Sequence, residues 1–153
     1  MKNTDYFAYL VDEIHSVIAA TTDENGLPVT CAIDIMDWGE NGLYFLTAKG
    51  KNFYRRLKQQ KYIALTGMKG EDTMSSTALS IRGNVVEFGA ERLPRLFQKN
   101  SYMHQIYPTA ESVAALTVFQ IYAGSGEWFD LLNYPINRET FSYNASEEKA
   151  GFE

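Results

Sequence analysis

Residues 43–67 read LYFLTAKGKNFYRRLKQQKYIALTG, with a strongly basic stretch between two apolar ones. Residues 49–61 hold six of the fourteen basic residues of the chain and none of its nineteen acidic residues. The apolar runs predict strands over 43–47 and 62–68, and a short helix over 53–60 lies between them. A chain with a net charge of −5 thus collects positive charge where a strand gives way to a helix.

The flanking sequence continues this alternation of strands and short helices. Asn25-Gly26 is a strong hairpin signal and leaves no room for a crossover helix between the first two strands. Five or six antiparallel strands with short helices between them predict a small, mainly β barrel. The predicted strands are 15–23, 28–38, 43–47, 62–68, 77–89 and 117–124, with a further segment at 127–132, and the predicted helices are 4–14, 53–60, 90–100 and 109–116.

The composition predicts an ordinary globular protein, with 45% hydrophobic and 22% charged residues. We expect a single domain over residues 1–140 and a polar, frayed tail over 141–153. The net charge argues against nucleic acid and anionic membranes as partners. The apolar run 7–11 is too short for a signal peptide, and Cys31 is the only cysteine, so we expect a cytoplasmic protein.

The residues just before the predicted helix favour an anion site. Lys49 and Lys51 lie near a helix N-terminus, where the dipole disfavours cations, and Gly50 lets the backbone approach a ligand. Asn52 is a good N-cap, and the free N–H groups behind it suit a phosphate. A solvated helix surface explains the same pattern. It is the simpler explanation for the basic side chains farther along the helix: Arg55, Arg56, Lys58 and Lys61.

Four segments together resemble the FMN-binding split-barrel family, the pyridoxamine 5′-phosphate oxidase-like proteins. The basic segment 43–67 carries the main resemblance, since family members have an aromatic-rich strand ending in Thr, a basic loop, a short helix and another strand. The others are VIAATTDENGLPVTCAIDI (17–35), LSIRGNVVEFG (79–89) and FQIYAGSGEWFD (119–130). The resemblance covers roughly residues 5–132 and implies a six-stranded antiparallel split β-barrel that binds FMN.

The resemblance implies a phosphate site and a ring site. Lys51 and Asn52 would bind the FMN phosphate, with Lys49 and Gly50 close by. The isoalloxazine ring would be bordered by Leu46 and Thr47.

The other implied contacts are at the pyrimidine edge and across a subunit interface. Backbone groups of Ala32, Ile33 and Asp34 would meet the pyrimidine edge. Trp128 would approach the flavin from the partner subunit of a homodimer, although a core or interface aromatic is an equal alternative.

Two departures from the family pattern bear on activity. Members that oxidise pyridoxamine phosphate carry a basic residue where this chain has Cys31, and an R-L-H-x-R run where residues 129–139 read FDLLNYPINRE. The substrate-phosphate clamp is therefore missing, so we expect no true pyridoxamine 5′-phosphate oxidase activity. In length the chain is closer to the short members, which include nitroimidazole-resistance-type proteins.

Three functions remain open from the sequence. The first is a homodimeric FMN-dependent oxidoreductase that takes electrons from NAD(P)H and passes them to a small molecule. The second is a non-catalytic protein that holds flavin, or another planar cofactor such as haem or a deazaflavin, for sensing or storage. The third is a barrel that binds an anionic metabolite. No catalytic acid–base pair stands out, and His15 and His104 lack neighbours at metal-ligand spacing.

Overall fold

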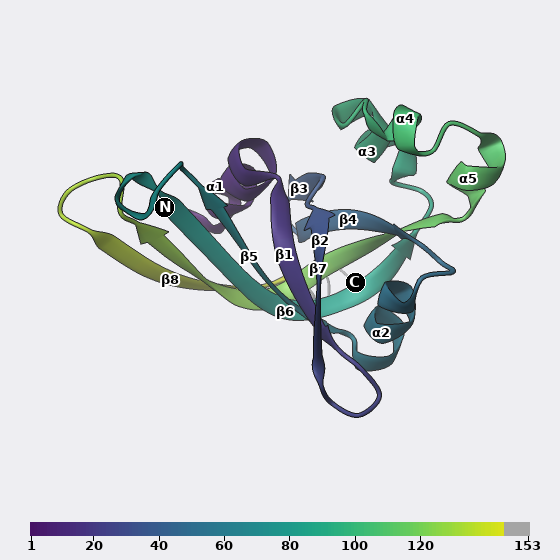
Figure 1. Ribbon diagram of the computed structural model, residues 1–153, viewed down its shortest axis with the longest axis horizontal. Helices are drawn as coiled ribbons and strands as arrows, with labels where there is room; N and C mark the ends of the chain where they lie inside the picture. The colour runs from purple at the N-terminus through teal and green to yellow at the C-terminus, as the bar shows by residue number, and fades with distance from the viewer. Residues whose placement is uncertain (146–153) are drawn as a thin grey trace.

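The computed structural model describes residues 1–145 (Figure 1). The helices are α1 (Asn3–Tyr9), η1 (Leu10–Ile14), α2 (Asn52–Gln60), η2 (Thr73–Ser75), α3 (Leu93–Lys99), α4 (Met103–Ile106) and α5 (Ala110–Ala114). The strands are β1 (Ser16–Thr22), β2 (Pro28–Asp34), β3 (Asp37–Gly39), β4 (Gly42–Ala48), β5 (Tyr62–Lys69), β6 (Thr77–Gly89), β7 (Leu116–Asp130) and β8 (Asn137–Asn144).

These strands form one antiparallel sheet in the order β2-β1-β5-β6-β7-β4-β3, with β8 added to β7. The predicted fold, mainly β with antiparallel strands and short helices, is confirmed. β7 is 15 residues long and replaces the two segments predicted at 117–124 and 127–132. It runs unbroken because β6 pairs along it on one side, while β4 and then β8 pair along the other.

The described residues depart from the predicted strands in two places. The strand predicted over 28–38 is divided into β2 and the three-residue β3, which is too short to show an alternating pattern of its own. β8 covers residues 141–144, which had been assigned to a frayed tail; the rest of that tail, 146–153, lies outside the described residues. The side chains of Phe141 and Tyr143 hold β8 in place, since they pack on the main core beside α1.

Two glycines allow β6 and β7 to lie unusually close. Gly83 is directly opposite Gly124, and a Cβ on Gly83 would come within 2.2 Å of the Ala123 carbonyl oxygen. The register shifts between Asn84 and Val85, so a bulge follows the glycine that the sequence marked as its candidate.

The core has two parts. The larger lies between the sheet and the helices α1 and η1, and its centre includes Phe7, Phe45 and Phe119, each about 1% exposed or less. The smaller lies under α3, α4 and α5, which together we call the helical lobe (residues 93–114). Leu46 and Met36 contribute to this second core. β4 therefore turns alternate side chains toward the two cores.

The sheet is split between β2 and β4. Within residues 1–145, β2 pairs only with β1, and residues 45–48 of β4 pair only with β7. The two strands approach each other where Met36 N donates to Tyr44 O at 2.9 Å, and from there they diverge. Figure 1 shows α2 at the wide end of this divergence. We call the wedge between the two free strand edges the split.

Candidate functional site

α2 begins without a cap from any side chain. Lys51 is the N-cap residue, with extended backbone, and neither a capping hydrogen bond nor an acidic first-turn residue is present in this helix. Asn52, predicted as the cap, is instead the first helical residue, and its Oδ1 accepts a hydrogen bond from Arg55 Nη1 at 3.3 Å. The N–H groups of the first turn are therefore left for water or an anionic ligand.

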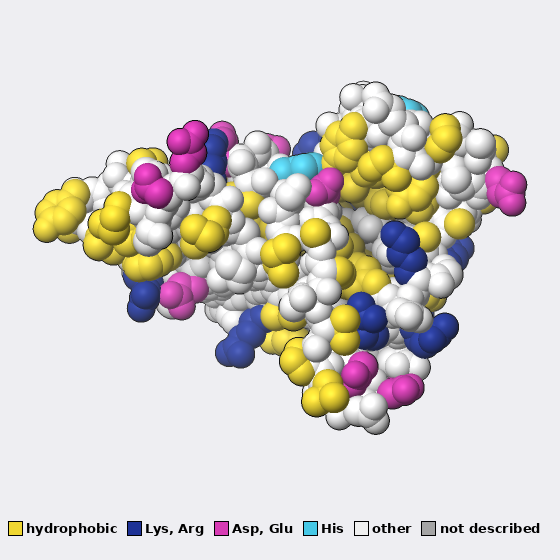
Figure 2. Space-filling model, in the orientation of Figure 1, with side chains coloured by type: hydrophobic (Ala, Val, Ile, Leu, Met, Phe, Trp, Pro, Cys, Tyr) yellow, Lys and Arg dark blue, Asp and Glu magenta, His cyan; other side chains and the backbone are white. Residues whose placement is uncertain are grey.

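The loop before α2 is exposed and positively charged. Within residues 1–145, the ammonium groups of Lys49 and Lys51 have neither an ion-pair nor a hydrogen-bond partner. A Cβ on Gly50 would meet no atom within 4 Å, so there is open space beside the loop. Figure 2 shows Lys and Arg side chains gathered around this loop and α2. This loop is the only part of the predicted site whose charges the fold leaves wholly unpaired.

Arg56 joins this site, although its position in the helix had suggested a solvated side chain. Its Nε donates to Thr21 Oγ1 on β1 at 2.8 Å, which holds the guanidinium between α2 and the sheet. The signal was present in the sequence, because Phe53, Arg56 and Leu57 share one helix face and both apolar members are buried.

Cys31 shows how close α2 lies to β2. Burial raises the pKa of its thiol, while the charges of Arg56 and Lys51 act in the opposite direction. Both cations are thus near Cys31, the position where the resemblance implies a basic residue in proteins that oxidise pyridoxamine phosphate. A raised pKa leaves less of the reactive thiolate at neutral pH, as is typical of an inert thiol.

The free edge of β2 presents backbone groups of alternate residues. Ile35 N donates to His15 O at 2.8 Å, which sets the register of the β1–β2 ladder. Because antiparallel ladders alternate, the N–H and C=O of Ala32 and Asp34 point into the split, whereas those of Ile33 point to β1. The predicted backbone contact of Ile33 is therefore corrected, and those of Ala32 and Asp34 remain possible.

The same rule applies to β4. Lys49 N donates to Ala115 O at 2.9 Å, so the odd-numbered residues of β4 bond to β7. The backbone groups of Leu46 and Ala48 face the split, whereas those of Thr47 are used in the ladder. The split thus offers hydrogen-bonding groups to a planar ligand on both sides.

The carboxylate of Asp34 is held in one position. Ser16 Oγ donates to its Oδ1 at 2.6 Å, and the hydroxyl of Tyr102 donates to its Oδ2 at 2.8 Å. Tyr102 belongs to the helical lobe, so this bond connects the lobe to the edge of β2. Local sequence patterns could not predict this hydrogen bond, because the two residues are 68 positions apart.

Trp128 lies in the core of its own chain. It is 7% exposed, and its ring packs edge-on against Tyr9, with the ring centroids 4.8 Å apart. Its position on β7 turns the side chain inward toward α1. Trp128 is therefore a core aromatic of its own chain, which was the alternative to a flavin contact, and it is not part of the candidate site.

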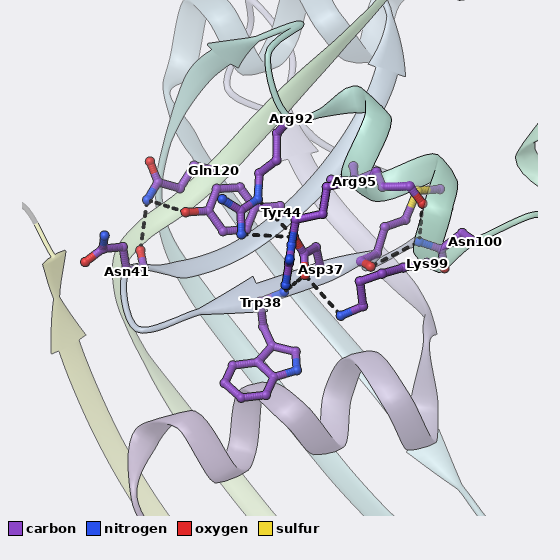
Figure 3. A network of polar contacts seen from close by, with 11 residues as sticks. Asp37, Trp38, Asn41, Tyr44, Arg92, Arg95, Lys99, Asn100 and Gln120 are labelled. Atoms are coloured by element: carbon purple, nitrogen blue, oxygen red, sulfur yellow. Dashed lines mark hydrogen bonds and ion pairs between the residues drawn. The ribbon is translucent and has the colours of Figure 1, made fainter.

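An ion cluster around a buried carboxylate fixes the helical lobe beside the split (Figure 3). The Asp37 carboxylate is 0% exposed and contacts Arg92 Nη2 at 2.9 Å, Arg95 Nε at 2.7 Å and Lys99 Nζ at 3.0 Å. Burial by itself would raise the pKa of Asp37, but hydrogen bonds from Arg95 and Lys99 and nearby positive charge lower it. Asp37 follows β2 closely, so the cluster ties the lobe to the narrow end of the split.

A second carboxylate holds α2 in place. Glu87 Oε1 accepts hydrogen bonds from Lys58 Nζ at 2.9 Å and the Tyr54 hydroxyl at 3.0 Å, both on α2. Its Oε2 accepts from Thr117 Oγ1 on β7 at 2.7 Å. Glu87 therefore connects the helix to the middle of the sheet.

Replacing Glu87 with Gln should lower the free energy of unfolding by about 1 kcal/mol, because the amide removes the charge and one acceptor oxygen. Urea unfolding followed by circular dichroism measures this difference. Glu91→Gln is the matched control, since Glu91 is exposed, and it should change stability by less than about 0.5 kcal/mol. Equal stability of the two variants would show that Glu87 does not anchor α2.

Comparison with known proteins identifies the class. The sequence model of the family described as Pyridoxamine 5′-phosphate oxidase matches residues 4–127. The chain therefore belongs to the pyridoxamine 5′-phosphate oxidase family. No curated protein sequence matches it.

Solved structures share the fold over nearly the whole chain. A NimC/NimA family protein from Clostridium acetobutylicum has a TM-score of 0.72 at 13% identity, with 92% of this chain and 95% of that chain covered. An FMN-binding protein related to pyridoxamine 5′-phosphate oxidase, from Nostoc punctiforme, has a TM-score of 0.62 at 11% identity, with 92% and 90% covered. A heme binding protein from Mycobacterium smegmatis has a TM-score of 0.68 at 10% identity, with 98% and 61% covered. Such low identities show a shared fold alone.

Among the described residues, no helix has the length and apolar character needed to cross a membrane.

Proposed function

We propose that this protein binds FMN at the split and acts as an FMN-dependent oxidoreductase on a small molecule. The observation that carries the proposal is the uncapped start of α2, with Lys51 and Arg56 beside it, at the wide end of the split. An uncapped helix N-terminus with two nearby cations suits a phosphate. Family membership supports a flavin as the bearer of that phosphate.

FMN would be held at two places, one for its phosphate and one for its ring. The first turn of α2 would hold the phosphate, together with Lys51, Arg56 and the exposed Lys49. The free edges of β2 and β4 would hold the ring, through backbone groups of Ala32, Asp34 and Leu46. When bound, FMN supplies the electron or hydride chemistry, while the protein supplies binding, orientation and exclusion of water.

We propose a homodimer that forms through the outer face of the sheet. This face contains a groove of about 840 Å³ lined mainly by small side chains, with Ile18 56% exposed beside it. Thr30 of β2 lines the same groove, so a partner docked there would border the split. Arg82 and Glu127 also line it; Glu127 is paired with Arg138 of the same chain at 3.0 Å, so Arg82 is the charge that a docked partner would meet.

Ile18→Glu should raise the dissociation constant of the dimer by at least about 100-fold, because it buries a charge in an apolar contact. Sedimentation equilibrium of the purified protein measures this change. Leu27→Glu is the control, since Leu27 is 60% exposed in the β1–β2 turn, away from the groove. A wild-type protein that is monomeric with flavin bound would contradict the proposed dimer.

The oxidoreductase is tested by nicotinamide oxidation. We expect the purified protein with FMN bound to oxidise NADH or NADPH when a small nitroaromatic or quinone acceptor is added. The matched control is the same protein with its flavin removed. Tight FMN binding without turnover on any acceptor would refute the proposed oxidoreductase activity and favour a non-catalytic flavin-binding protein.

A non-catalytic protein that holds flavin, haem or a deazaflavin for sensing or storage is the alternative. This alternative is supported by the structural similarity to a heme binding protein. An F420 reductase is also similar in structure, with a TM-score of 0.59 at 18% identity. The chromophore released on denaturation distinguishes these cofactors. The missing substrate-phosphate clamp continues to argue against pyridoxamine phosphate as the substrate.

A further inference from the structure

The helical lobe is held against the split by two charged attachments, besides the neutral hydrogen bond from Asn100 Nδ2 to Met36 O at 3.1 Å. One is the ion cluster of Asp37, whose charges persist at neutral pH, because the pKa of Asp37 is lowered and that of Arg95 is raised. The other joins Tyr102 of the lobe to Asp34 of β2 and also involves His15. Histidine is the side chain whose charge changes most readily near neutral pH. The second attachment is therefore the one that pH can alter.

The hydrogen bonds around His15 have a defined order. The Tyr102 hydroxyl donates to Asp34 Oδ2 at 2.8 Å, so its oxygen is left to accept from His15 Nε2. Burial, followed by the hydrogen bond to Asp34, raises the pKa of Tyr102, so the phenol keeps its proton. The other ring nitrogen, Nδ1, faces the Val11 carbonyl oxygen at 3.2 Å. A carbonyl oxygen can only accept.

Both ring nitrogens of His15 thus face acceptors, and only the imidazolium form donates from both. Its positive charge lies 3.6 Å from the carboxylate of Asp34, whose other oxygen accepts from Ser16. A neutral imidazole loses one of these bonds. If Nδ1 carries no proton, its lone pair faces the carbonyl oxygen of Val11 and that hydrogen bond is lost. If Nε2 carries no proton, the Tyr102 hydroxyl must donate to it instead of to Asp34.

We propose that His15, Tyr102 and Asp34 form a proton-sensitive strap that holds the helical lobe over the split, and that loss of the His15 proton loosens it. The groups that contact the His15 ring are the Asp34 carboxylate from β2, the Tyr102 hydroxyl from the lobe and the Val11 carbonyl from η1. Leu46 lies in the core under the lobe, and its backbone faces the split. Loosening the lobe uncovers this edge. The consequence for ligand access rests on the proposed FMN site, whereas the strap itself does not.

Hydrogen exchange of the purified full chain, measured at pH 6 and pH 8 and corrected for intrinsic exchange rates, tests the strap. We expect amides of residues 93–114 to lose about tenfold in protection at the higher pH, as the loss of one charged hydrogen bond predicts. Tyr102→Phe and His15→Gln should each abolish this pH dependence. His104→Gln, which changes the other histidine of the chain, should preserve it.

Two results would overturn the strap: equal protection of the lobe at both pH values in the wild-type protein, or a pH dependence that survives in Tyr102→Phe. Using Tyr102→Phe, which retains the ring, avoids reliance on His15→Gln if that variant folds poorly. The rate of FMN association, measured at the same two pH values, then tests access. A pH-dependent lobe in a protein that binds no flavin would refute the proposed function and leave the strap intact.

Discussion

Replacing Asp37 with Ala is expected to lower the free energy of unfolding by about 3 kcal/mol, the lower end of the cost of breaking a buried ion pair, because the carboxylate is buried but its cationic partners are partly exposed. The carboxylate is 0% exposed and contacts three cations, of which Arg92 and Lys99 are less than one-third exposed. Without it, these charges repel one another in a partly dehydrated site. The Arg92 guanidinium also stacks on Tyr44, 3.7 Å from the ring centroid, so the second core should loosen too.

Urea unfolding is the suitable measurement, because guanidinium chloride would screen the charges. Glu40→Ala is the matched control, since Glu40 is an exposed acid in the adjacent turn and should cost less than about 0.5 kcal/mol. A loss below about 1 kcal/mol for Asp37→Ala would contradict the anchoring role of the cluster.

The cluster also predicts a pH dependence of stability. The pKa of Asp37 is lower in the folded protein than its ordinary value, so the unfolded chain takes up the proton first as pH falls. The stabilisation is therefore complete above about pH 4 and is lost as pH falls through the folded pKa below it. The stability difference between wild type and Asp37→Asn should be constant from pH 5 to 8 and shrink below pH 4. A difference that grows on acidification would have the wrong sign.

Removing Lys51 and Arg56 together should weaken FMN binding by about 100-fold or more. Each contact between a charged donor and a phosphate contributes about 1.5–3 kcal/mol, and a factor of ten corresponds to about 1.4 kcal/mol. The double variant Lys51→Ala/Arg56→Ala leaves the ring site of β2 and β4 intact. Its affinity for riboflavin, which lacks the phosphate, should therefore stay within about threefold of wild type.

Arg55→Ala is the matched control for this double variant. Arg55 is on the same helix and carries the same charge, but it is exposed, and among residues 1–145 its side chain bonds only to Asn52. Quenching of flavin fluorescence gives the affinities. An unchanged FMN affinity in the double variant, with its fold intact by circular dichroism, would show that the phosphate is not bound at α2.

Much of the fold could be predicted from the sequence, because the strands that carry it are long and alternate clearly. The hairpin at Asn25-Gly26 and the helix before β5 follow from local rules, as does the capped start of α5, where Thr109 Oγ1 accepts from Ser112 N at 3.0 Å. β8 was missed because its polar residues resemble a tail. What secures it is packing with α1, and sequence periodicity carries no information about that contact.

The candidate site was predicted in part. The charged loop 49–51 was found because its composition is unusual in an acidic chain. Arg56 shares a helix face with Phe53 and Leu57, which indicated that it points toward the sheet, but its contact with Thr21 on a different strand could not be predicted. The side of each strand that faces the split could not be known without the ladder register, and this register excludes the backbone groups of Ile33 and Thr47. Burial of Trp128 under α1 likewise depends on long-range packing.

The central claim is that the basic segment after β4 holds the phosphate of FMN. The most direct test is to titrate the purified wild-type protein, freed of chromophore, with FMN and with riboflavin by calorimetry at the same salt concentration. The two ligands differ only in the phosphate. We predict FMN to bind at least about 100-fold more tightly than riboflavin. Equal affinities, or no binding of either flavin, would contradict the account.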